Sequence, residues 1–139
     1  MSGLEFVDTN VLLYAYDRSA GRRHERARSL VARLGRDRVG AVSIQVLQEF
    51  HVNATSKIAR PLSSAAARER IQTLGRWTVH VPVVDEVLAA SQLAERHQLS
   101  FWDAMIVTSA AALRCQVLHT EDLNHGQVVG DVRIVNPFA

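Results

Sequence analysis

The stretch Leu4-Glu5-Phe6-Val7-Asp8-Thr9-Asn10-Val11-Leu12 decides the fold of this chain. Residues 4–7 form a short apolar segment that predicts a buried strand, and the polar residues directly after it predict a turn. Asp8 or Asn10 can cap a helix over residues 11–16 by accepting hydrogen bonds from its first backbone N–H groups. A strand that passes at once into a capped helix is the beginning of a β–α unit.

The same alternation of strand and helix continues to the end of the chain. Apolar segments predict further strands over residues 39–42, 78–81, 116–119 and 132–135. Helical periodicity predicts helices over residues 22–34, 44–56, 64–74, 85–97 and 101–113, with Gly35 and Gly75 as stops and Asp85 as a cap. Because the strands are short and apolar on both sides, we expect a three-layer α/β/α sandwich around a mostly parallel, five-stranded sheet.

Length and composition exclude several classes of protein. With 139 residues, 47% of them hydrophobic, the chain suits one compact domain over residues 1–139. A single cysteine, Cys115, excludes an internal disulfide framework and is typical of a reducing compartment. We expect no signal peptide and no membrane span, since no stretch approaches the ~20 apolar residues that a span needs. The expected location is the cytoplasm.

Positive charge is concentrated in one segment. Residues 18–38 hold eight arginines against Glu25 and Asp37, whereas the rest of the chain has seven arginines and Lys57 against twelve acids. A basic flank beside an acidic remainder is compatible with a polyanion that lies along one face of the protein. A solvated, arginine-rich helix face would give the same pattern.

Four acidic residues lie where ligands bind in open α/β sheets, outside the carboxyl ends of the strands. Asp8 follows the first strand, Glu49 lies in the helix after the second, Asp103 opens the helix before the fourth, and Asp122 follows the fourth. Each acid alone has an ordinary interpretation as a helix cap, a turn residue or a solvated helix residue. Their joint placement at one edge of the sheet favours a shared site.

The energetics of such a cluster point to a cation. Asp103 is the one charged residue between 101 and 113, so we expect it to be largely buried. Two carboxylates ~4 Å apart repel by about 4 kcal/mol at an effective dielectric constant near 20, and a divalent cation removes that cost. Ligands that are all carboxylates favour Mg²⁺ or Mn²⁺ over zinc. Such ions are suited to hydrolysis of a phosphate-bearing substrate.

The acids occur in four segments: Phe6-Val7-Asp8-Thr9-Asn10-Val11-Leu12, Gln48-Glu49-Phe50, Phe101-Trp102-Asp103-Ala104 and Leu118-His119-Thr120-Glu121-Asp122-Leu123. In order and spacing these segments resemble the PIN-domain family of ribonucleases, and within it the VapC-type toxins of bacterial toxin–antitoxin pairs. The resemblance implies a metal-dependent endoribonuclease whose four acids hold Mg²⁺ or Mn²⁺. It also assigns Thr9, Asn10 and Ser43 to ordering or supporting the site.

Two positions in this site stay open from the sequence. Glu121 and Asp122 are adjacent acids, and either is a candidate for the fourth ligand, with the Thr-x-Asp spacing favouring Asp122. Asn53 lies one helical turn beyond Glu49, so it either orients that carboxylate or is an ordinary exposed residue. Our hypothesis for the reaction is in-line attack by water on an RNA phosphodiester, which leaves 5′-phosphate and 3′-hydroxyl ends. Arg18, Arg22 and Arg23 are candidate contacts to the RNA backbone.

The resemblance also implies partners, and other functions remain as rivals. VapC-type toxins are typically held inactive by a VapB-type antitoxin and commonly form homodimers. Trp77, which we expect to be exposed, is a candidate contact. Leu12, Leu13 and Tyr16 are further candidates, although the sequence favours a core role for these three. One rival is a catalytically silent PIN-like module that only binds RNA. Another is a phosphoreceiver-like signalling domain, which would need a lysine after its last strand, whereas the lysine here is Lys57. A third rival is a nuclease that uses a pair of histidines for acid–base catalysis, but the six histidines show no paired spacing.

Overall fold

A computed structural model describes residues 3–139 of the chain. Strands and helices alternate along it, as the sequence predicts. In chain order the elements are β1 (Glu5–Val7), α1 (Thr9–Tyr16), a short 3₁₀ turn η1 (Arg18–Ala20), α2 (Arg22–Asp37), β2 (Gly40–Ser43), α3 (Ile44–Ser56), α4 (Ser64–Leu74), β3 (Thr78–His80), α5 (Val84–His97), α6 (Phe101–Ala112), β4 (Val117–His119), β5 (Val128–Val129) and β6 (Val132–Val135).

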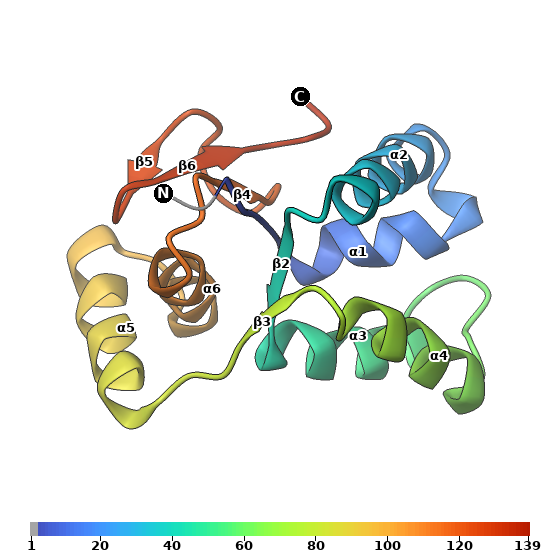
Figure 1. Cartoon of the computed structure of the whole chain (residues 1–139), viewed down its shortest axis with the longest axis horizontal. Helices are drawn as coiled ribbons and strands as arrows, with labels where there is room; N and C mark the ends of the chain where they lie inside the picture. The colour runs from blue at the N-terminus through green and yellow to red at the C-terminus, as the bar shows by residue number, and fades with distance from the viewer. Residues whose placement is uncertain (1–2) are drawn as a thin grey trace.

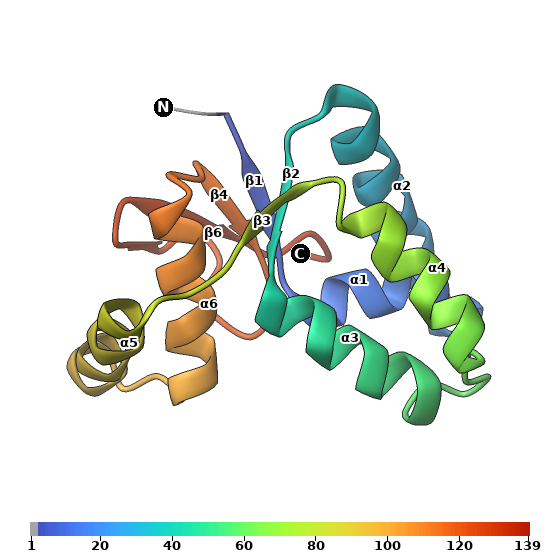
Figure 2. The ribbon, with the colours of Figure 1, turned by 60° about the horizontal axis from the view of Figure 1, so that its bottom comes forward.

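The sheet has β1 near its centre and helices on both sides. Within the described residues it has six strands in the order β3-β2-β1-β4-β6-β5, and every neighbouring pair is parallel except β5 and β6. Figure 1 shows α5 and α6 on one side of the sheet and α1 to α4 on the other; the rotated view of Figure 2 agrees. The predicted three-layer α/β/α fold is confirmed. The prediction of five strands missed β5, which has only two residues.

Apolar side chains fill the space between the layers. Phe6 and Val7 point to opposite faces of β1 and both are fully buried, so this strand is covered on both sides as its sequence predicts. The helix α5 packs against α6 through a smaller cluster of Ala90, Ala104 and Met105. Cys115 is buried, and that burial raises the pKa of its thiol to about 12, so it is a packing residue.

Two predicted helix boundaries were wrong. The helix α2 does not stop at Gly35 but continues to Asp37, and Arg38 ends it in the left-handed conformation with φ 58°. A glycine costs a helix only about 1 kcal/mol, and burial of Leu34 at the preceding position outweighs that cost. The helix α5 is capped at Val83 rather than Asp85, because the Glu86 carboxylate accepts the Val83 N–H at 2.9 Å.

One residue expected on the surface packs against the core. Trp77 was predicted to be exposed, but it is half-buried and its ring lies directly over Gly40. A Cβ atom at position 40 would lie 2.5 Å from that ring, so only glycine permits the contact. Leu12 and Leu13 on α1 are buried, which confirms the core role that the sequence favoured for them. Among residues 3–139, no helix combines the length and the apolar character that crossing a membrane requires.

Candidate active site

The four predicted acids are carried by elements that meet at the carboxyl-terminal edge of the sheet. Asp8 follows β1 and is the N-cap of α1. Ser43 ends β2 and caps α3, the helix that carries Glu49. Asp103 lies in the first turn of α6, and the loop after β4 carries Asp122. Figure 2 shows the first turns of α1 and α3 side by side below the strands.

Asp8 is the buried acid of the site. Its side chain accepts hydrogen bonds from the Thr9 N–H at 2.7 Å and from the Thr120 hydroxyl at 2.8 Å. Burial, reinforced by the nearby charges of Asp122 and Asp103, raises the pKa of Asp8 to about 7, although the two hydrogen bonds oppose the change. A carboxyl group whose pKa is raised this far above its usual range is typical of a functional site.

Glu49 is held by two neutral donors. The buried Thr9 hydroxyl donates to Glu49 Oε1 at 2.7 Å, which connects the first turn of α1 with α3. On the other carboxylate oxygen, Gln45 Nε2 lies 3.5 Å from Glu49 Oε2 and also 3.4 Å from the Trp102 carbonyl in α6. Gln45 Oε1 is buried without a hydrogen-bond partner among the described residues. Gln45 therefore bridges the two helices that carry Glu49 and Asp103.

Asp122 is connected to Asp8 through Thr120. The Thr120 hydroxyl, which donates to Asp8, accepts the Asp122 N–H at 3.1 Å. Partial burial, together with the charges of Asp103, Glu121 and Glu49, raises the pKa of Asp122, while a hydrogen bond with Asp8 lowers it in part. Asp122 is therefore an electrostatic neighbour of all the other candidate acids.

Glu121, the alternative fourth acid, has different partners. Its Oε1 accepts a hydrogen bond from the Tyr14 hydroxyl at 2.8 Å, and its Oε2 forms an ion pair with Arg23 Nε at 3.2 Å. The Arg23 guanidinium also lies over the rings of Tyr14 and Phe138. Since both oxygens of Glu121 are engaged in this contact, the geometry favours Asp122 as the acid of the site.

Asp103 is half-buried rather than largely buried as its apolar surroundings in the sequence suggested. It lies in the first turn of α6, where its N–H donates to the Ser100 hydroxyl at 3.0 Å. A carboxylate in the first turn faces the positive end of the helix dipole and stays partly hydrated. Its charge nevertheless contributes to the raised pKa of Asp8 and of Asp122, so it belongs to the same cluster.

The cluster fits a hard divalent cation in its chemistry and its charge. All its donor atoms are carboxylate oxygens. The largest contributions to the pKa of Asp8 and of Asp122 come from burial, hydrogen bonds and other carboxylates, and none of these comes from a basic side chain. As the side chains stand, residues 3–139 contain no group of three or more acidic, histidine or cysteine side chains placed to hold an ion together. The fit is therefore one of donor type and charge.

The other predicted site residues lie at varied distances from this cluster. Thr9 contacts Glu49 directly, whereas Ser43 is fully buried and its hydroxyl accepts the Val46 N–H. Asn10 is exposed and Asn53 is half-buried, and in residues 3–139 neither side chain is hydrogen-bonded to a site acid. Thr120 and Gln45, which sequence analysis did not single out, make those contacts instead. The Thr-x-Asp spacing was the available signal for Thr120, and the polar stripe of Gln45 with Glu49 was the signal for Gln45.

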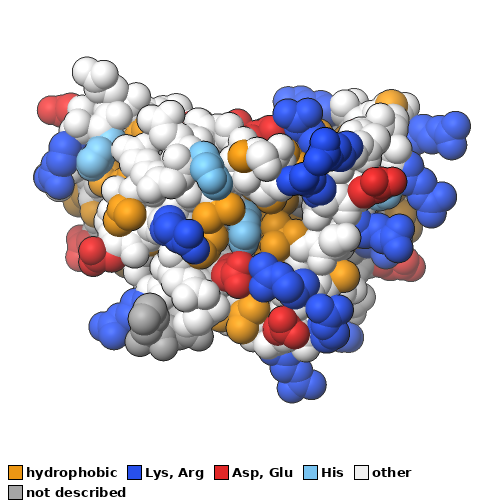
Figure 3. All heavy atoms as spheres, turned by 90° about the horizontal axis from the view of Figure 1, so that it is seen from above, with side chains coloured by type: hydrophobic (Ala, Val, Ile, Leu, Met, Phe, Trp, Pro, Cys, Tyr) orange, Lys and Arg blue, Asp and Glu red, His pale blue; other side chains and the backbone are white. Residues whose placement is uncertain are grey.

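The candidate RNA-binding arginines do not form one group. Arg23 pairs with Glu121, Arg22 begins α2, and Arg18 lies in η1. Figure 3, which views the molecule from above, shows basic side chains gathered over the part of that face where α2 lies in Figure 1. The basic surface is therefore adjacent to the loop that carries Asp122.

The rival chemistries find no matching site in the described residues. His80 accepts or donates hydrogen bonds with Ser109 at 2.9 Å and Glu86 at 3.0 Å, which is the composition of a catalytic triad. Ser109 is fully buried, however, so substrate cannot reach its hydroxyl and the trio connects β3, α5 and α6 structurally. Lys57 is exposed at the C-cap of α3, more than two helical turns beyond Glu49, and not at the acidic edge.

Comparisons with known proteins agree with this fold. Solved structures with similar folds include a toxin–antitoxin complex from Klebsiella pneumoniae (TM-score 0.67, 20% identity, 96% of this chain and 97% of that chain covered). Another is the sarcin–ricin loop cleaving toxin VapC20 from Mycobacterium tuberculosis (TM-score 0.66, 23% identity, 85% of this chain and 89% of that chain covered). A third is VapBC2 from Rickettsia felis bound to promoter DNA (TM-score 0.65, 17% identity, 94% of this chain and 96% of that chain covered). No curated protein is significantly similar in sequence. The model of the PIN domain matches residues 6–130, and the chain therefore belongs to the PIN-domain family.

Proposed function

We propose that this protein is a Mg²⁺- or Mn²⁺-dependent endoribonuclease that acts as the toxin of a VapBC-type toxin–antitoxin pair. The observation that carries the proposal is the acidic cluster itself. Asp8 and Asp122 lie among carboxylates from other elements, and burial together with those charges raises the pKa of both, that of Asp8 to about 7. A fold that only needed stability would not retain such a cluster, because each added charge costs folding free energy.

The chain's own residues have distinct parts in the proposed reaction. The residues that would hold the cation are Asp8, Glu49, Asp103 and Asp122. The Thr9 hydroxyl orients the Glu49 carboxylate, and the Thr120 hydroxyl orients that of Asp8. A bound Mg²⁺ supplies Lewis-acid chemistry, which lowers the pKa of water and stabilises charge on phosphoryl oxygens. Attack by water rather than by the RNA 2′-hydroxyl leaves 5′-phosphate and 3′-hydroxyl ends.

The proposed partners follow from the same comparisons. The structural neighbours from Klebsiella pneumoniae and Rickettsia felis are complexes of toxin and antitoxin, and we expect a VapB-type antitoxin to bind this chain as well. An antitoxin segment that places a basic residue at the acidic cluster would be favoured electrostatically. RNA is the expected substrate, as ribosomal RNA is for a toxin described as cleaving the sarcin–ricin loop.

A homodimer is the second proposed assembly. Leu12, Leu13 and Trp77 are not free to form it, since they are buried or packed in the core. Apolar side chains are instead exposed in the segment from β3 into α5 and at the start of α6, namely Val81, Val83, Val84, Leu88 and Trp102. Light scattering should give twice the chain mass for the wild type and the monomer mass for Leu88→Asp.

The decisive experiment measures RNA cleavage with a chelator and a matched pair of variants. Asp8→Asn should lower cleavage by a factor of about 10³ or more, and EDTA should abolish it until Mg²⁺ or Mn²⁺ is restored. Glu95→Gln, which removes an exposed acid from α5, is the control and should cleave as the wild type does. The product ends should carry 5′-phosphate. Cleavage that survives both EDTA and Asp8→Asn would refute the proposal, and RNA binding without any cleavage would favour the silent RNA-binding module.

A further inference from the structure

A hollow of about 490 Å³ lies at the far end of α1 from the acidic cluster. It opens between η1 and the connection from α3 to α4, and we call it the α1 hollow. Tyr16, Asp17 and Arg18 line it from one side, and Ala59, Arg60 and Leu62 line it from the other. Its volume lies in the range of sites that hold small ligands or single groups of larger ones. Nothing in the proposed cleavage step uses these residues.

The α1 hollow carries positive charge that the protein does not neutralise. Arg18 and Arg60 are exposed, and neither guanidinium has a hydrogen-bond or ion-pair partner in residues 3–139. The lining acid, Asp17, accepts hydrogen bonds from the N–H and hydroxyl of Ser19 and keeps its negative charge, but the two arginines of the lining outnumber it. A third cation, Arg70, lies 5.1 Å from the centre of the Tyr16 ring. An anionic ligand would therefore be attracted to this hollow from two separate segments of the chain.

The floor of the hollow is apolar and fixed in position. The Tyr16 ring packs edge-on against Phe50 with 5.5 Å between centroids. Leu62 is held by a hydrogen bond from its N–H to the Ala54 carbonyl at 2.8 Å, which anchors the loop that carries Arg60. A rigid ring beside guanidinium groups suits a nucleotide, because the ring supports a base or sugar while the guanidinium groups bind phosphate.

Helix α1 connects this hollow to the acidic cluster. Asp8 caps its first turn and Tyr16 is its last residue, and a helix of eight residues is about 12 Å long. That distance is within the span of a few nucleotides of single-stranded RNA. The separation between the acids and the hollow is therefore compatible with one RNA strand that contacts both.

We propose that the α1 hollow binds a nucleotide of the RNA strand next to the cleavage site, with Arg18 and Arg60 on its phosphate and Tyr16 against its base or sugar. The identity of the strand rests on the proposed ribonuclease function. The proposal adds Arg60 and Tyr16, which lie outside the basic segment 18–38, to the candidate RNA contact Arg18. Arg23 is not part of the hollow, because its guanidinium forms an ion pair with Glu121.

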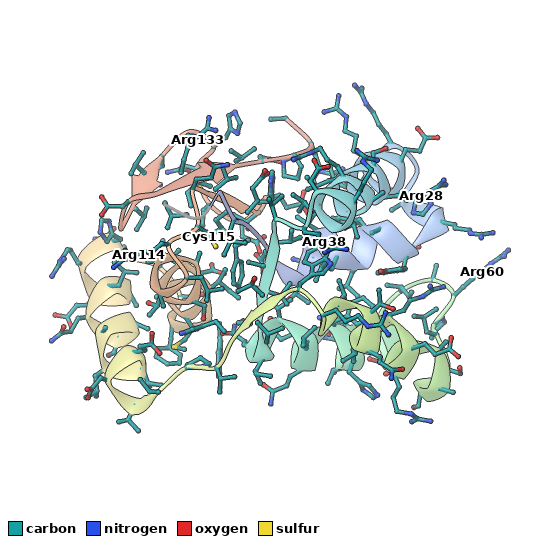
Figure 4. The ribbon with its side chains drawn as sticks, in the orientation of Figure 1. Arg28, Arg38, Arg60, Arg114, Cys115 and Arg133 are labelled. Carbon is teal, nitrogen blue, oxygen red and sulfur yellow. The ribbon has the colours of Figure 1, made fainter. Side chains whose placement is uncertain are left out.

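The test measures binding of a labelled single-stranded RNA in EDTA, so that no cleavage occurs. Arg18→Gln/Arg60→Gln should raise Kd by on the order of tenfold or more. It should also reduce the slope of log K against log salt by about 0.7, since the two arginines share one phosphate and each phosphate contact contributes about that much. The control pair is Arg96→Gln/Arg133→Gln, which removes the same charge from α5 and β6. Figure 4 shows Arg60 and Arg133 at opposite ends of the molecule.

Cleavage kinetics in Mg²⁺ give a second, independent measurement. Because the contact is remote from the reacting phosphate, the double variant should raise KM and leave kcat within about twofold of the wild type. Tyr16→Leu should weaken binding while leaving the salt slope unchanged, since it removes a ring and no charge. Equal melting temperatures for all variants would show that folding is not the cause.

The outcomes separate this inference from the proposed function. Cleavage with unchanged Kd, KM and salt slope in the double variant would overturn the inference and leave the nuclease intact. Binding that depends on Arg18 and Arg60 without any cleavage would support the hollow and overturn the nuclease. Binding of an acidic peptide, lost in the double variant while RNA binding is unchanged, would assign the hollow to a protein partner and overturn the inference.

Discussion

Glu5 and Asp8 lie three residues apart, in and directly after the same strand, and the protein treats their charges in opposite ways. Burial tends to raise the pKa of Glu5, but hydrogen bonds from Arg33, at 3.0 and 3.1 Å, and from His119 outweigh it and lower that pKa. Asp8 receives only a hydroxyl and a backbone N–H, and its pKa is raised to about 7. The protein therefore binds the Glu5 carboxylate with basic side chains, whereas the donors that hold the Asp8 carboxylate are neutral.

Glu121 and Asp122 repeat the contrast at the end of β4. Glu121 has an arginine and a tyrosine as partners, whereas Asp122 faces other carboxylates and its pKa is raised. In both pairs the compensated acid connects elements of the fold and the uncompensated one faces the candidate site. The difference teaches that the unneutralised charge is local to one edge of the sheet. An external cation is the simplest agent that would neutralise it there.

The largest expected effect concerns the pH dependence of stability. The raised pKa means that native Asp8 keeps its proton up to about pH 7, whereas the unfolded chain loses it near the ordinary aspartate pKa of 3.8. The native state thus binds more protons over this window, so stability is full below pH 4 and falls as the pH rises through 7. Against Asp8→Asn, the wild type should lose on the order of 4 kcal/mol in the free energy of unfolding between pH 4 and 8.

Urea denaturation in EDTA at several pH values measures this difference. Asparagine caps a helix as well as aspartate does, so Asp8→Asn should keep α1 intact. Adding Mn²⁺ at pH 8 should stabilise the wild type and have little effect on the variant. Parallel pH profiles for the two proteins would show that Asp8 carries no uncompensated charge, and the contrast with Glu5 would fail.

The opposite sign is expected at Glu5. Glu5→Gln removes a carboxylate that is bound by Arg33 and His119, and hydrogen bonds to charged groups contribute about 1.5–3 kcal/mol. We expect a loss of about 2 kcal/mol in the free energy of unfolding at pH 7. Because the pKa of Glu5 is lowered, this stabilisation is present above about pH 4.5 and is lost as the pH falls further.

Arg33→Gln and the double variant complete a cycle for this pair. A coupling free energy of about 1 kcal/mol or more at pH 7 would confirm the compensation, and cleavage by the folded variants should stay within a few-fold of wild type. A stabilising Glu5→Gln substitution would contradict it.

The adjacent acids after β4 give the next test, of intermediate size. Asp122→Asn should weaken Mn²⁺ binding by about 30-fold, which is about 2 kcal/mol, because it removes a candidate ligand. Glu121→Gln should change Mn²⁺ affinity by less than threefold, since that side chain faces Arg23 and Tyr14. Calorimetric titration of Mn²⁺ into both variants measures the difference. The reverse ranking would assign the fourth ligand to Glu121.

Much of this contrast was invisible in the sequence, although the fold was not. The strands and helices followed from apolar periodicity, and the bounds of α3 were predicted to the residue because Ser43 and Lys57 delimit a clear amphipathic pattern. Partnerships across the chain have no such local signal. Glu5 meets Arg33 from α2, 28 residues away, and Glu121 meets Arg23 from 98 residues away. Only the packing of helices on the sheet decides which arginine reaches which acid.

The candidate site shows the same division between local and distant information. Sequence position identified four acids at one sheet edge, because parallel strands bring their carboxyl ends together. The sequence predicted the wrong acid to be the buried one. Asp103 lies in an apolar helix yet stays half-exposed, whereas Asp8, which follows a strand, is buried. Asn53 was considered as a partner of Glu49, but the contact is made by Gln45 on the preceding turn. Equal spacing along a helix cannot distinguish these two neighbours.

The smallest expected effect concerns Gln45, the neutral bridge between α3 and α6. Its amide donates toward both Glu49 and the Trp102 carbonyl, and it leaves Oε1 buried without a partner in the described residues. An unsatisfied buried oxygen costs about 1–3 kcal/mol, so Gln45→Leu should leave the apo protein as stable as wild type or more so. The same substitution frees Glu49 on one side, and we expect Mn²⁺ affinity to fall about tenfold, as is usual when a residue behind a ligand is removed. Gln48→Leu, on an exposed face of the same helix, is the matched control, and equal Mn²⁺ affinity in all three proteins would show that Thr9 alone positions Glu49.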